Sequence, residues 1–267
     1  MMTSFGVDLG TSNLREPVTI SALEFDVLWE HLRLETMPLV LKVPSPGKTH
    51  AERAELERTA WAGLERRGLG KPVSLDPELE DLLHLLNRPQ AEVDGRLWLG
   101  HSVRVLAAAK GQSGVLAVLD SDQLTLRAAS SEGLPREALS VLPSAPAGPG
   151  HSITLPSADL DAAAAAARTP EELERVLSGR GVRADDAHTL AEMMRDASNR
   201  GQFGTAARDK WGKRRRPERV VAFFDGPGGR YVQMRRAAPG QQPWSTVSPV
   251  DTRRLDHHLT ELLSESL

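Results

Sequence analysis

The chain has 267 residues, a formal charge of −3 at pH 7 and no cysteine. The absence of cysteine excludes disulfide frameworks, thiolate metal sites, iron–sulfur clusters and cysteine nucleophiles. No stretch of about 18 apolar residues is present, and no basic segment followed by an apolar one opens the chain, so we expect a cytoplasmic protein with no membrane association. The near-neutral charge gives no support for nucleic-acid binding.

The first half of the chain predicts helices followed by antiparallel strands. Residues 1–18 show no helical period and no capping signal, and we expect a disordered tail there. Ser21–Glu24 and Thr49–Glu52 are capping boxes, in which a hydroxyl and a carboxylate satisfy free N–H groups at a helix start. The predicted elements are helices from Ser21, over 49–67 and from Asp76, a strand over 38–43, strands over 93–99, 102–109, 115–119 and 124–129, and a helix over 135–142.

A linker rich in Pro and Gly at 143–150 leads to a second segment of similar order. Its helices are indicated by capping residues, and its strands by short apolar runs between turn residues. The predicted elements are a strand over 152–155, helices over 159–167, from Thr169 and from Asp185, strands over 203–208, 219–224, 230–235 and 244–247, and a last helix after Asp251.

The two segments align with each other as an internal duplication. We therefore predict an α+β fold with a mostly antiparallel sheet: a single domain over 19–267, made of two similar halves, about 38–142 and 151–265, with pseudo-two-fold symmetry. Because exposed sheet edges are normally paired or covered, we expect the two half-sheets to join edge to edge. The matched segments are 42–45 with 154–157, 67–69 with 180–182, Asp76 with Asp185, and 115–120 with 220–225.

Two glycine-containing segments resemble phosphate-binding loops and define the alternative function, a nucleotide-binding enzyme. Gly6–Asn13 is similar to the first phosphate loop of actin-like ATPases, but the second loop of that family has no counterpart here. Gly47–Thr49 opens a helix as a Walker A loop does, but Lys42 stands where that motif requires an earlier glycine. We expect both resemblances to be accidental and no cofactor to be bound.

Other candidate sites lack the patterns that their chemistry needs. The eight histidines are scattered without metal-ligand spacing, and no Gly-x-Ser-x-Gly elbow occurs, so we expect no metal and no catalytic residue. The basic run Lys213–Arg216 lies within 208–219. We interpret it as a solvated loop before a strand, with contact to an acidic partner or a nucleic-acid adaptor as the alternatives.

A set of motifs carries a family resemblance: 21–32, 38–53, 103–108, 115–120, 201–204 and Arg230-Tyr231. Together they resemble the EspG family, the ESX (type VII) secretion-associated proteins of actinobacteria. The resemblance implies a central sheet flanked by two helical bundles with quasi-two-fold symmetry, and a cytosolic chaperone that is not an enzyme and needs no cofactor. It implies a client with an apolar helical tip, PE–PPE-like or WXG-type, which the chaperone keeps soluble and export-competent as a monomer or weak homodimer.

The chain is interpreted as a handler of secreted proteins and not as one of them. An export signal of the form Tyr-x-x-x-Asp/Glu is absent, because Arg235 follows the only tyrosine, Tyr231, at the fourth position. The family resemblance implies that a client rests on the sheet face and the C-terminal bundle, although core packing is the alternative for Trp98 and the two methionines. The implied partner-binding residues are Trp98, Leu99, His101, Val103, Lys110, Gln112, Met193 and Met194.

Overall fold

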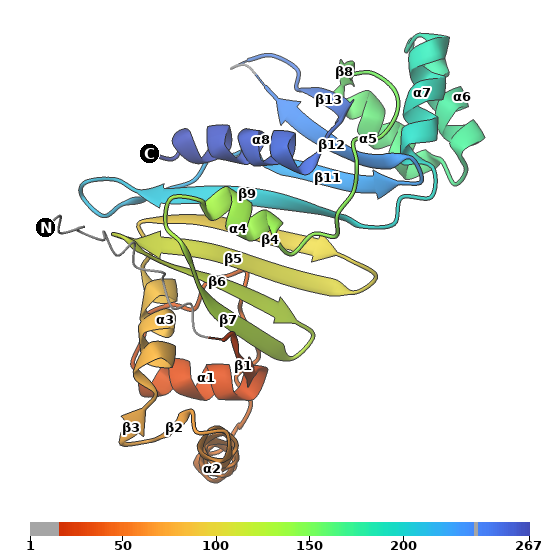
Figure 1. The fold of residues 1–267 in the computed structure, drawn as a ribbon. Coiled ribbons are helices and arrows are strands. Elements are labelled where there is room, and N and C mark those ends of the chain that lie inside the picture. The colour runs from red at the N-terminus through yellow and green to blue at the C-terminus, as the bar shows by residue number, and fades with distance from the viewer. Residues whose placement is uncertain (1–15, 238–239) are drawn as a thin grey trace, which may run out of the picture.

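The computed structural model describes residues 16–237 and 240–267, and one large antiparallel sheet forms its centre (Figure 1). Within the described chain this sheet has eleven strands in the order β1-β7-β6-β5-β4-β9-β11-β12-β13-β8, with β10 paired to β9. The predicted α+β class is confirmed. Of the tail expected to be disordered, residues 1–15 lie outside the described residues, and Val18 already belongs to β1.

In the first half, a short strand leads into three helices, and a four-stranded meander follows. Both predicted capping boxes are present, since Ser21 and Thr49 each accept a hydrogen bond from the N–H of a glutamate three residues later. The elements are β1 (Val18–Ser21), α1 (Ala22–His31), α2 (His50–Arg66), β2 (Gly70–Lys71), β3 (Ser74–Leu75), α3 (Pro77–Asn87), β4 (Ala91–Trp98), β5 (Ser102–Lys110), β6 (Ser113–Asp120), β7 (Gln123–Ser130) and α4 (Leu134–Leu139).

The second half repeats this order, except that the β2–β3 pair has no counterpart in it and one strand, β10, is added. Thr169 and Asp251 cap helices α6 and α8 through side-chain oxygens, as the sequence predicts. The elements are β8 (Ile153–Pro156), α5 (Ser157–Ala166), α6 (Pro170–Gly179), α7 (Ala184–Met194), β9 (Arg200–Arg208), β10 (Arg214–Arg215), β11 (Val221–Gly226), β12 (Gly229–Arg236), β13 (Trp244–Pro249) and α8 (Thr252–Ser264).

The two half-sheets join at the pair β4–β9, and the strand order is the same outward in both directions. From β4 the neighbours are β5, β6, β7 and β1, and from β9 they are β11, β12, β13 and β8. The junction is antiparallel over eight residue pairs, from Ala91↔Ala207 to Trp98↔Arg200. The edge-to-edge pairing thus covers one exposed edge of each half.

The duplication extends to single side-chain contacts. The hydroxyls of Thr19 and Thr125 are 3.0 Å apart between β1 and β7, and those of Thr154 and Thr246 are 2.9 Å apart between β8 and β13. At the end of α2 the guanidinium of Arg67 pairs with Glu24 at 2.6 Å, and at the end of α6 that of Arg180 pairs with Asp159 at 2.9 Å. These contacts make β1 the counterpart of β8, and α2 that of α6.

Two parts of the predicted duplication are wrong. Residues 38–43 form a turn, with the N–H of Leu41 donating to the carbonyl of Pro38, and not a strand. Val40, Leu41 and Val43 of this run are buried in the core with the first bundle, although Leu39 is exposed, and these apolar residues imitate a strand in the sequence. Residues 115–120 lie in β6, whereas 221–225 lie in β11, which holds the position of β5. We propose that the repeats run from β1 to α4 and from β8 to α8.

Side chains alternate between the two faces of the sheet, as a strand period of two requires. On β5, Leu106 and Ala108 pack with the helices α1–α3, and Val105 and Ala107 pack on the opposite face with α4 and α8. A third cluster fills the space beneath α5–α7. The bundles α1–α3 and α5–α7 lie at the two ends of the sheet, and α4 and α8 lie across its middle (Figure 1).

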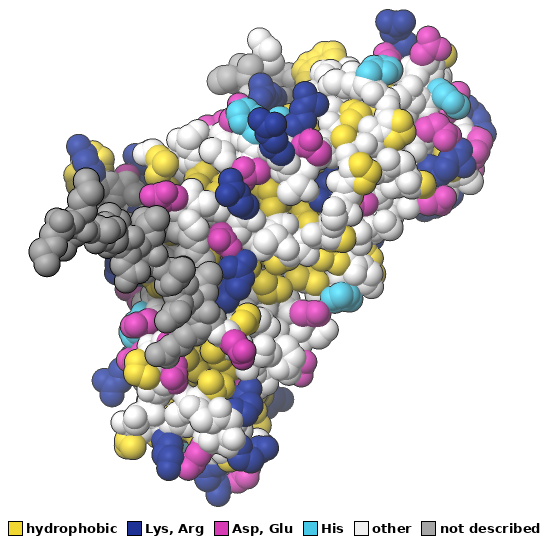
Figure 2. Space-filling model, in the orientation of Figure 1, with side chains coloured by type: hydrophobic (Ala, Val, Ile, Leu, Met, Phe, Trp, Pro, Cys, Tyr) yellow, Lys and Arg dark blue, Asp and Glu magenta, His cyan; other side chains and the backbone are white. Residues whose placement is uncertain are grey.

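The face with the two bundles has no helix over β4 and β9, where Arg96, Trp98, Arg200 and Gln202 are exposed. On the other side, which carries α4 and α8, charged side chains gather at the two ends and hydrophobic ones near the middle (Figure 2). No helix in the described segments is both long and apolar enough to cross a membrane.

A buried ion pair on β12 fixes the segment that joins the two halves. Arg230 is fully buried, and its Nε and Nη2 donate to the carboxylate of Asp225 at 2.7 and 3.0 Å. Nη2 also donates to the carbonyl oxygen of Pro143 at 2.9 Å, and the Tyr231 hydroxyl donates to that of Pro149 at 3.2 Å. The predicted linker is therefore bound to the sheet along its length.

We expect Arg230→Met to lower the free energy of unfolding by about 3–5 kcal/mol, because it leaves the Asp225 carboxylate buried without a counter-charge. Urea denaturation followed by circular dichroism measures the change. In Arg235→Met, the lost pair with Asp161 is half-exposed on both sides, and we expect a loss of at most about 1 kcal/mol. Equal losses in the two variants would contradict the structural role given to Arg230.

Candidate functional site

Three adjoining cavities open on the uncovered face of the sheet between the two bundles. The central cavity has a volume of about 520 Å³. It shares Gln202, Ala222 and Gln233 with a cavity of about 1100 Å³ on one side, and Arg96 with one of about 390 Å³ on the other. We call the continuous surface of these three cavities the trough.

The central cavity combines an apolar floor with cationic side chains. Trp98 is 45% exposed there, and the guanidinium of Arg200 lies 5.7 Å from the centroid of the indole ring, within cation–π range. Arg96 is the second charged residue of this lining, which contains no carboxylate. The apolar side chains of this lining are Trp98, Met194, Ala197, Ala222 and Phe224, whereas the side chains of Leu97 and Phe223 pack in the cluster on the opposite face.

Strand register brings these side chains together from distant segments. Across β4–β9, Trp98 is opposite Arg200, and Arg96 is opposite Gln202. Residues that are paired or two apart along a strand point to the same face, so all four side chains reach the trough. Met194 is the last residue of α7, where the second bundle meets the sheet. The trough is therefore built across the junction of the two halves.

Of the residues expected to bind a partner, the structure brings Trp98 and Met194 to one cavity. Met193 is buried beneath α7 with 1% of its surface exposed. Val103 is buried on the opposite face of the sheet, within the cluster under α4 and α8, and Leu99 packs against that same cluster. The alternation of side chains along each strand separates Val103 from Trp98, although the two are close in sequence.

The other three expected residues lie at the ends of the β5–β6 hairpin and do not line the trough. His101 is in the turn before β5, where its Nε2 lies 3.1 Å from the Asp120 carboxylate. Lys110 and Gln112 lie at the far end of the same hairpin, and both are exposed. Arg96 and Arg200 line the trough but are absent from the sequence-based set. Arg96 lies on the same face of β4 as Trp98, and the β4–β9 register places Arg200 opposite Trp98.

The basic segment 208–219 is fixed over one end of the trough. Arg214 pairs with Glu92, and Arg216 pairs with Asp94, and both carboxylates lie on β4 with little exposure. The hydrogen bonds and the charge of Asp94 raise the pKa of the Arg216 guanidinium above its ordinary value. The run is exposed to solvent, as its interpretation as a solvated loop requires, but these two arginines also attach it to the sheet.

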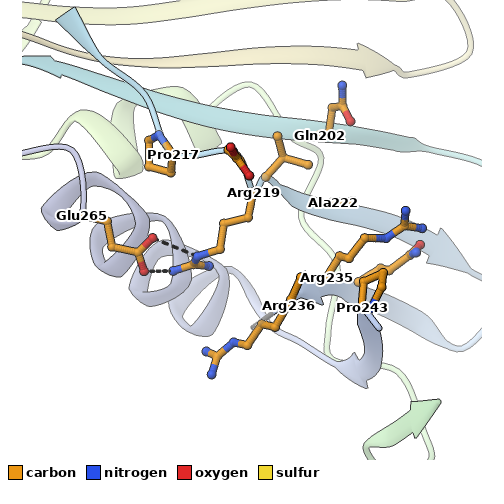
Figure 3. Close-up of a pocket in the computed structure, with 12 residues that line it drawn as sticks. Gln202, Pro217, Arg219, Ala222, Arg235, Arg236, Pro243 and Glu265 are labelled. Atoms are coloured by element: carbon orange, nitrogen blue, oxygen red, sulfur yellow. Dashed lines mark hydrogen bonds and ion pairs between the residues drawn. The ribbon is translucent and has the colours of Figure 1, made fainter. Parts of the chain in front are cut away.

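The largest cavity lies where β11 begins, beside the end of α8 (Figure 3). Arg219 pairs there with Glu265, and this interaction lowers the pKa of the glutamate below its ordinary value. Arg235 and Arg236 extend into the same region from β12 (Figure 3). Arginine is thus the main charged residue along the whole trough.

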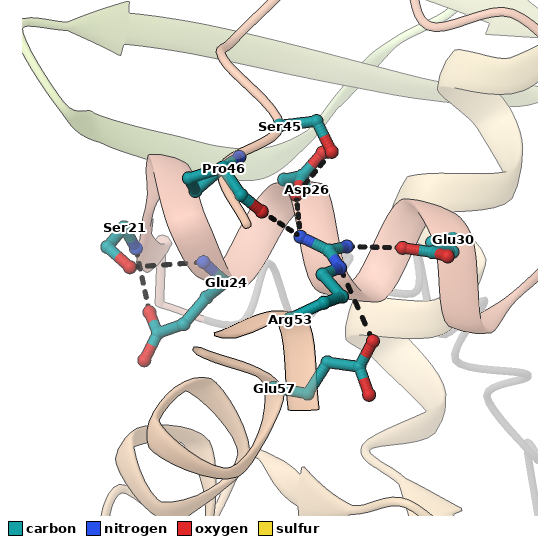
Figure 4. A network of polar contacts seen from close by, with 8 residues as sticks. All are labelled: Ser21, Glu24, Asp26, Glu30, Ser45, Pro46, Arg53 and Glu57. Atoms are coloured by element: carbon teal, nitrogen blue, oxygen red, sulfur yellow. Dashed lines mark hydrogen bonds and ion pairs between the residues drawn. The ribbon is translucent and has the colours of Figure 1, made fainter. Parts of the chain in front are cut away.

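In the segment that resembles a Walker A loop, a glutamate side chain occupies N–H groups at the helix start that a phosphate would use. The N–H groups of Lys48 and Thr49 both donate to the carboxylate of Glu52, at 2.9 and 3.1 Å. The same loop is held by Arg53, which joins α2 to Asp26 and Glu30 on α1 (Figure 4). The other candidate loop, 6–13, lies outside the described residues.

Neither the fold nor the chemistry of the described residues suggests a metal site. No group of three or more His, Asp or Glu side chains comes together in the described parts of the chain. Most histidines near carboxylates contact one carboxylate at the surface, such as His188 with Glu174, whose hydrogen bond raises the pKa of that imidazole above its ordinary value. His258 is less exposed, and burial lowers the pKa of its imidazole.

Two comparisons with known proteins find similar chains. The model of the EspG family matches residues 21–261. A solved structure of the Mycobacterium tuberculosis type VII secretion system chaperone EspG5, in complex with the PE25–PPE41 dimer, is similar at 16% identity with a TM-score of 0.70, and the match covers 94% of this chain and 97% of that one. At this identity the second match shows the fold alone. No curated protein matches the chain.

We expect Asp94→Asn to loosen the basic segment over the trough, because the neutral amide holds the Arg216 guanidinium more weakly. Amide hydrogen exchange of Arg214 and Arg215 should be about fivefold faster, as expected for the loss of up to about 1 kcal/mol from a partly exposed pair. Exchange in the β5–β6 hairpin serves as the internal control. Unchanged exchange at both arginines would contradict this role of Asp94.

We expect no heat of binding when ATP with Mg²⁺ is titrated into the protein in a calorimeter. The N–H groups of Lys48 and Thr49, directly before α2, already donate to Glu52, so a phosphate that binds them would have to displace a carboxylate. Glu52→Gln is the control, because it changes this loop alone and so distinguishes ATP binding at the loop from binding elsewhere on the protein. Saturable binding that Glu52→Gln strengthens would restore the nucleotide-binding alternative.

Proposed function

The chain belongs to the EspG family of type VII secretion chaperones, and on that premise we propose that it shields the apolar tip of a helical secretion substrate in the trough. Members of this family are chaperones and not enzymes. An exposed apolar tip promotes self-association, and a cytoplasmic partner that covers it keeps the substrate soluble until export. The proposed substrate is a PE–PPE-like pair or a WXG-type helical protein.

The observation that carries this proposal is the meeting of Trp98 and Met194 on the floor of one open cavity. An apolar centre with a polar rim is the usual anatomy of a protein-recognition surface. A half-exposed tryptophan supplies a large contact area, and an unbranched methionine adapts its shape to the side chains of a partner. Both residues belong to rigid elements, β4 and α7, so the floor is preformed.

The position of the trough also supports the binding of an elongated partner. The trough follows the β4–β9 junction between the two bundles, and its three cavities form one open surface. Helical tips dock into such grooves through a few apolar side chains at helical spacing. EspG5, which has a similar fold, was solved in complex with the PE25–PPE41 dimer, and we infer a client of that class for this chain.

We expect Trp98→Ala to weaken client binding about 10- to 100-fold, because truncation of a central aromatic removes much of the contact area. Met194→Asp should weaken it at least as much, since it places a charge on the apolar floor. The variants are co-expressed with helical pairs from the secretion locus of the same organism, and affinity is measured by calorimetry on the purified complexes.

Trp211→Ala is the matched control, because Trp211 is 77% exposed but does not line the trough. It should bind clients as the natural chain does. Circular dichroism and the urea midpoint show whether each variant is folded. Normal client affinity in a folded Trp98→Ala and a folded Met194→Asp would exclude the trough as the binding site.

A further inference from the structure

The trough carries a charge opposite to that of the whole chain. Eight arginines and four carboxylates line its three cavities, whereas the chain as a whole has a formal charge of −3. A local excess of one sign in a concave surface attracts partners of the other sign and repels partners of the same sign. Three of the four carboxylates are already held by arginines, namely Glu92 by Arg214, Asp94 by Arg216 and Glu265 by Arg219.

Two arginines of the central cavity, Arg96 and Arg200, and a third beside the trough, Arg104, are neighbours on the sheet. The β4–β5 register places Arg96 directly opposite Arg104, and the β4–β9 register makes Arg200 its diagonal neighbour. Within the described residues, Arg96 and Arg200 form no ion pair, and Arg104 donates only to the carbonyl oxygen of Lys42 at 2.9 Å. Like charges that face each other across a strand pair destabilise a sheet. An anion between them would remove this repulsion.

The carboxylate on the same face of β4 as Arg96, that of Asp94, already has an arginine partner. Asp94 is two residues before Arg96 on the same face of β4, but both of its oxygens accept hydrogen bonds from Arg216. Gly204 provides the space for that guanidinium, because a Cβ there would lie 2.2 Å from Nη2 of Arg216. Among the described residues no carboxylate pairs with Arg96 or Arg200, so a partner can supply the negative charge beside them.

The chemistry of that partner follows from the floor and the arginines together. Trp98, Met194 and Phe224 favour apolar side chains, and arginine binds carboxylates through two parallel hydrogen bonds. A nucleic acid fits less well, because successive bases need several stacking aromatics and a basic protein, and this chain is acidic. The central cavity therefore matches a protein segment that is apolar and acidic at once.

We propose that the trough selects clients whose apolar helical tip carries carboxylates, which bind Arg96 and Arg200. This inference rests on the proposed function and adds the charge of the client to it. The apolar floor supplies most of the contact, and the arginines discriminate among tips and speed association. A client with a basic or neutral tip leaves the arginines desolvated without a counter-charge and binds more weakly.

The test uses two synthetic helix–turn–helix peptides with the same leucines and phenylalanine at the turn. One has two glutamates beside them, and the other has glutamines. Affinity for the full chain is measured by fluorescence anisotropy at low and at high salt. We expect the glutamate peptide to bind roughly tenfold more tightly at low salt, with a smaller difference at high salt.

Arg96→Gln/Arg200→Gln should abolish this preference, so that the glutamate and glutamine peptides bind with equal affinity at low salt. Arg136→Gln, on the exposed side of α4, is the matched control and should keep the preference. If both peptides bind equally well, and Trp98→Ala abolishes the binding of both, the inference is overturned while the proposed function stands. Failure of both peptides to bind would contradict the proposed trough itself, and tighter binding of an oligothymidylate than of the glutamate peptide would identify a nucleic-acid site instead.

Discussion

The pairing of β4 with β9 is the constraint on which the rest of this structure depends. Eight residue pairs join the half-sheets and leave the short strands β1 and β8 as the outer edges. Each half alone would expose a long central strand, which is a template for aggregation. The same pairing places the two helical bundles at opposite ends of one sheet and leaves the face between them open. The two-fold body and its trough thus have one cause.

The segment between the halves shows how this arrangement is held. Arg230 and Tyr231 on β12 bind carbonyl oxygens of the connecting segment, so the chain crosses from α4 to β8 on a fixed path. The fully buried guanidinium is compensated by Asp225 and by the ring of Phe223 at 5.2 Å. A buried pair of this kind adds less to stability than to specificity of structure, because both charges lose their hydration.

Arginine performs two different tasks around the trough. Arg214 and Arg216 neutralise carboxylates on β4 and attach the basic segment to the sheet. Arg96 and Arg200 have the same chemistry but face the open centre, beside the indole of Trp98. The distinction depends on which strand register brings a carboxylate within reach. The open centre therefore combines an apolar floor with two arginines that form no ion pair among the described residues.

The sequence by itself determined the helices, the meanders and the fact of duplication, because caps, glycines and apolar periods are local signals. It also indicated Trp98 and Met194 for the site. The strand predicted over 38–43 was wrong because an apolar run shows burial but not the partner against which it packs. Only the tertiary structure decided that β1 is the counterpart of β8, that the basic run pairs with β4, and that Arg96 lies beside Arg200. Register between strands far apart in sequence sets each of these contacts, and a linear pattern does not contain it.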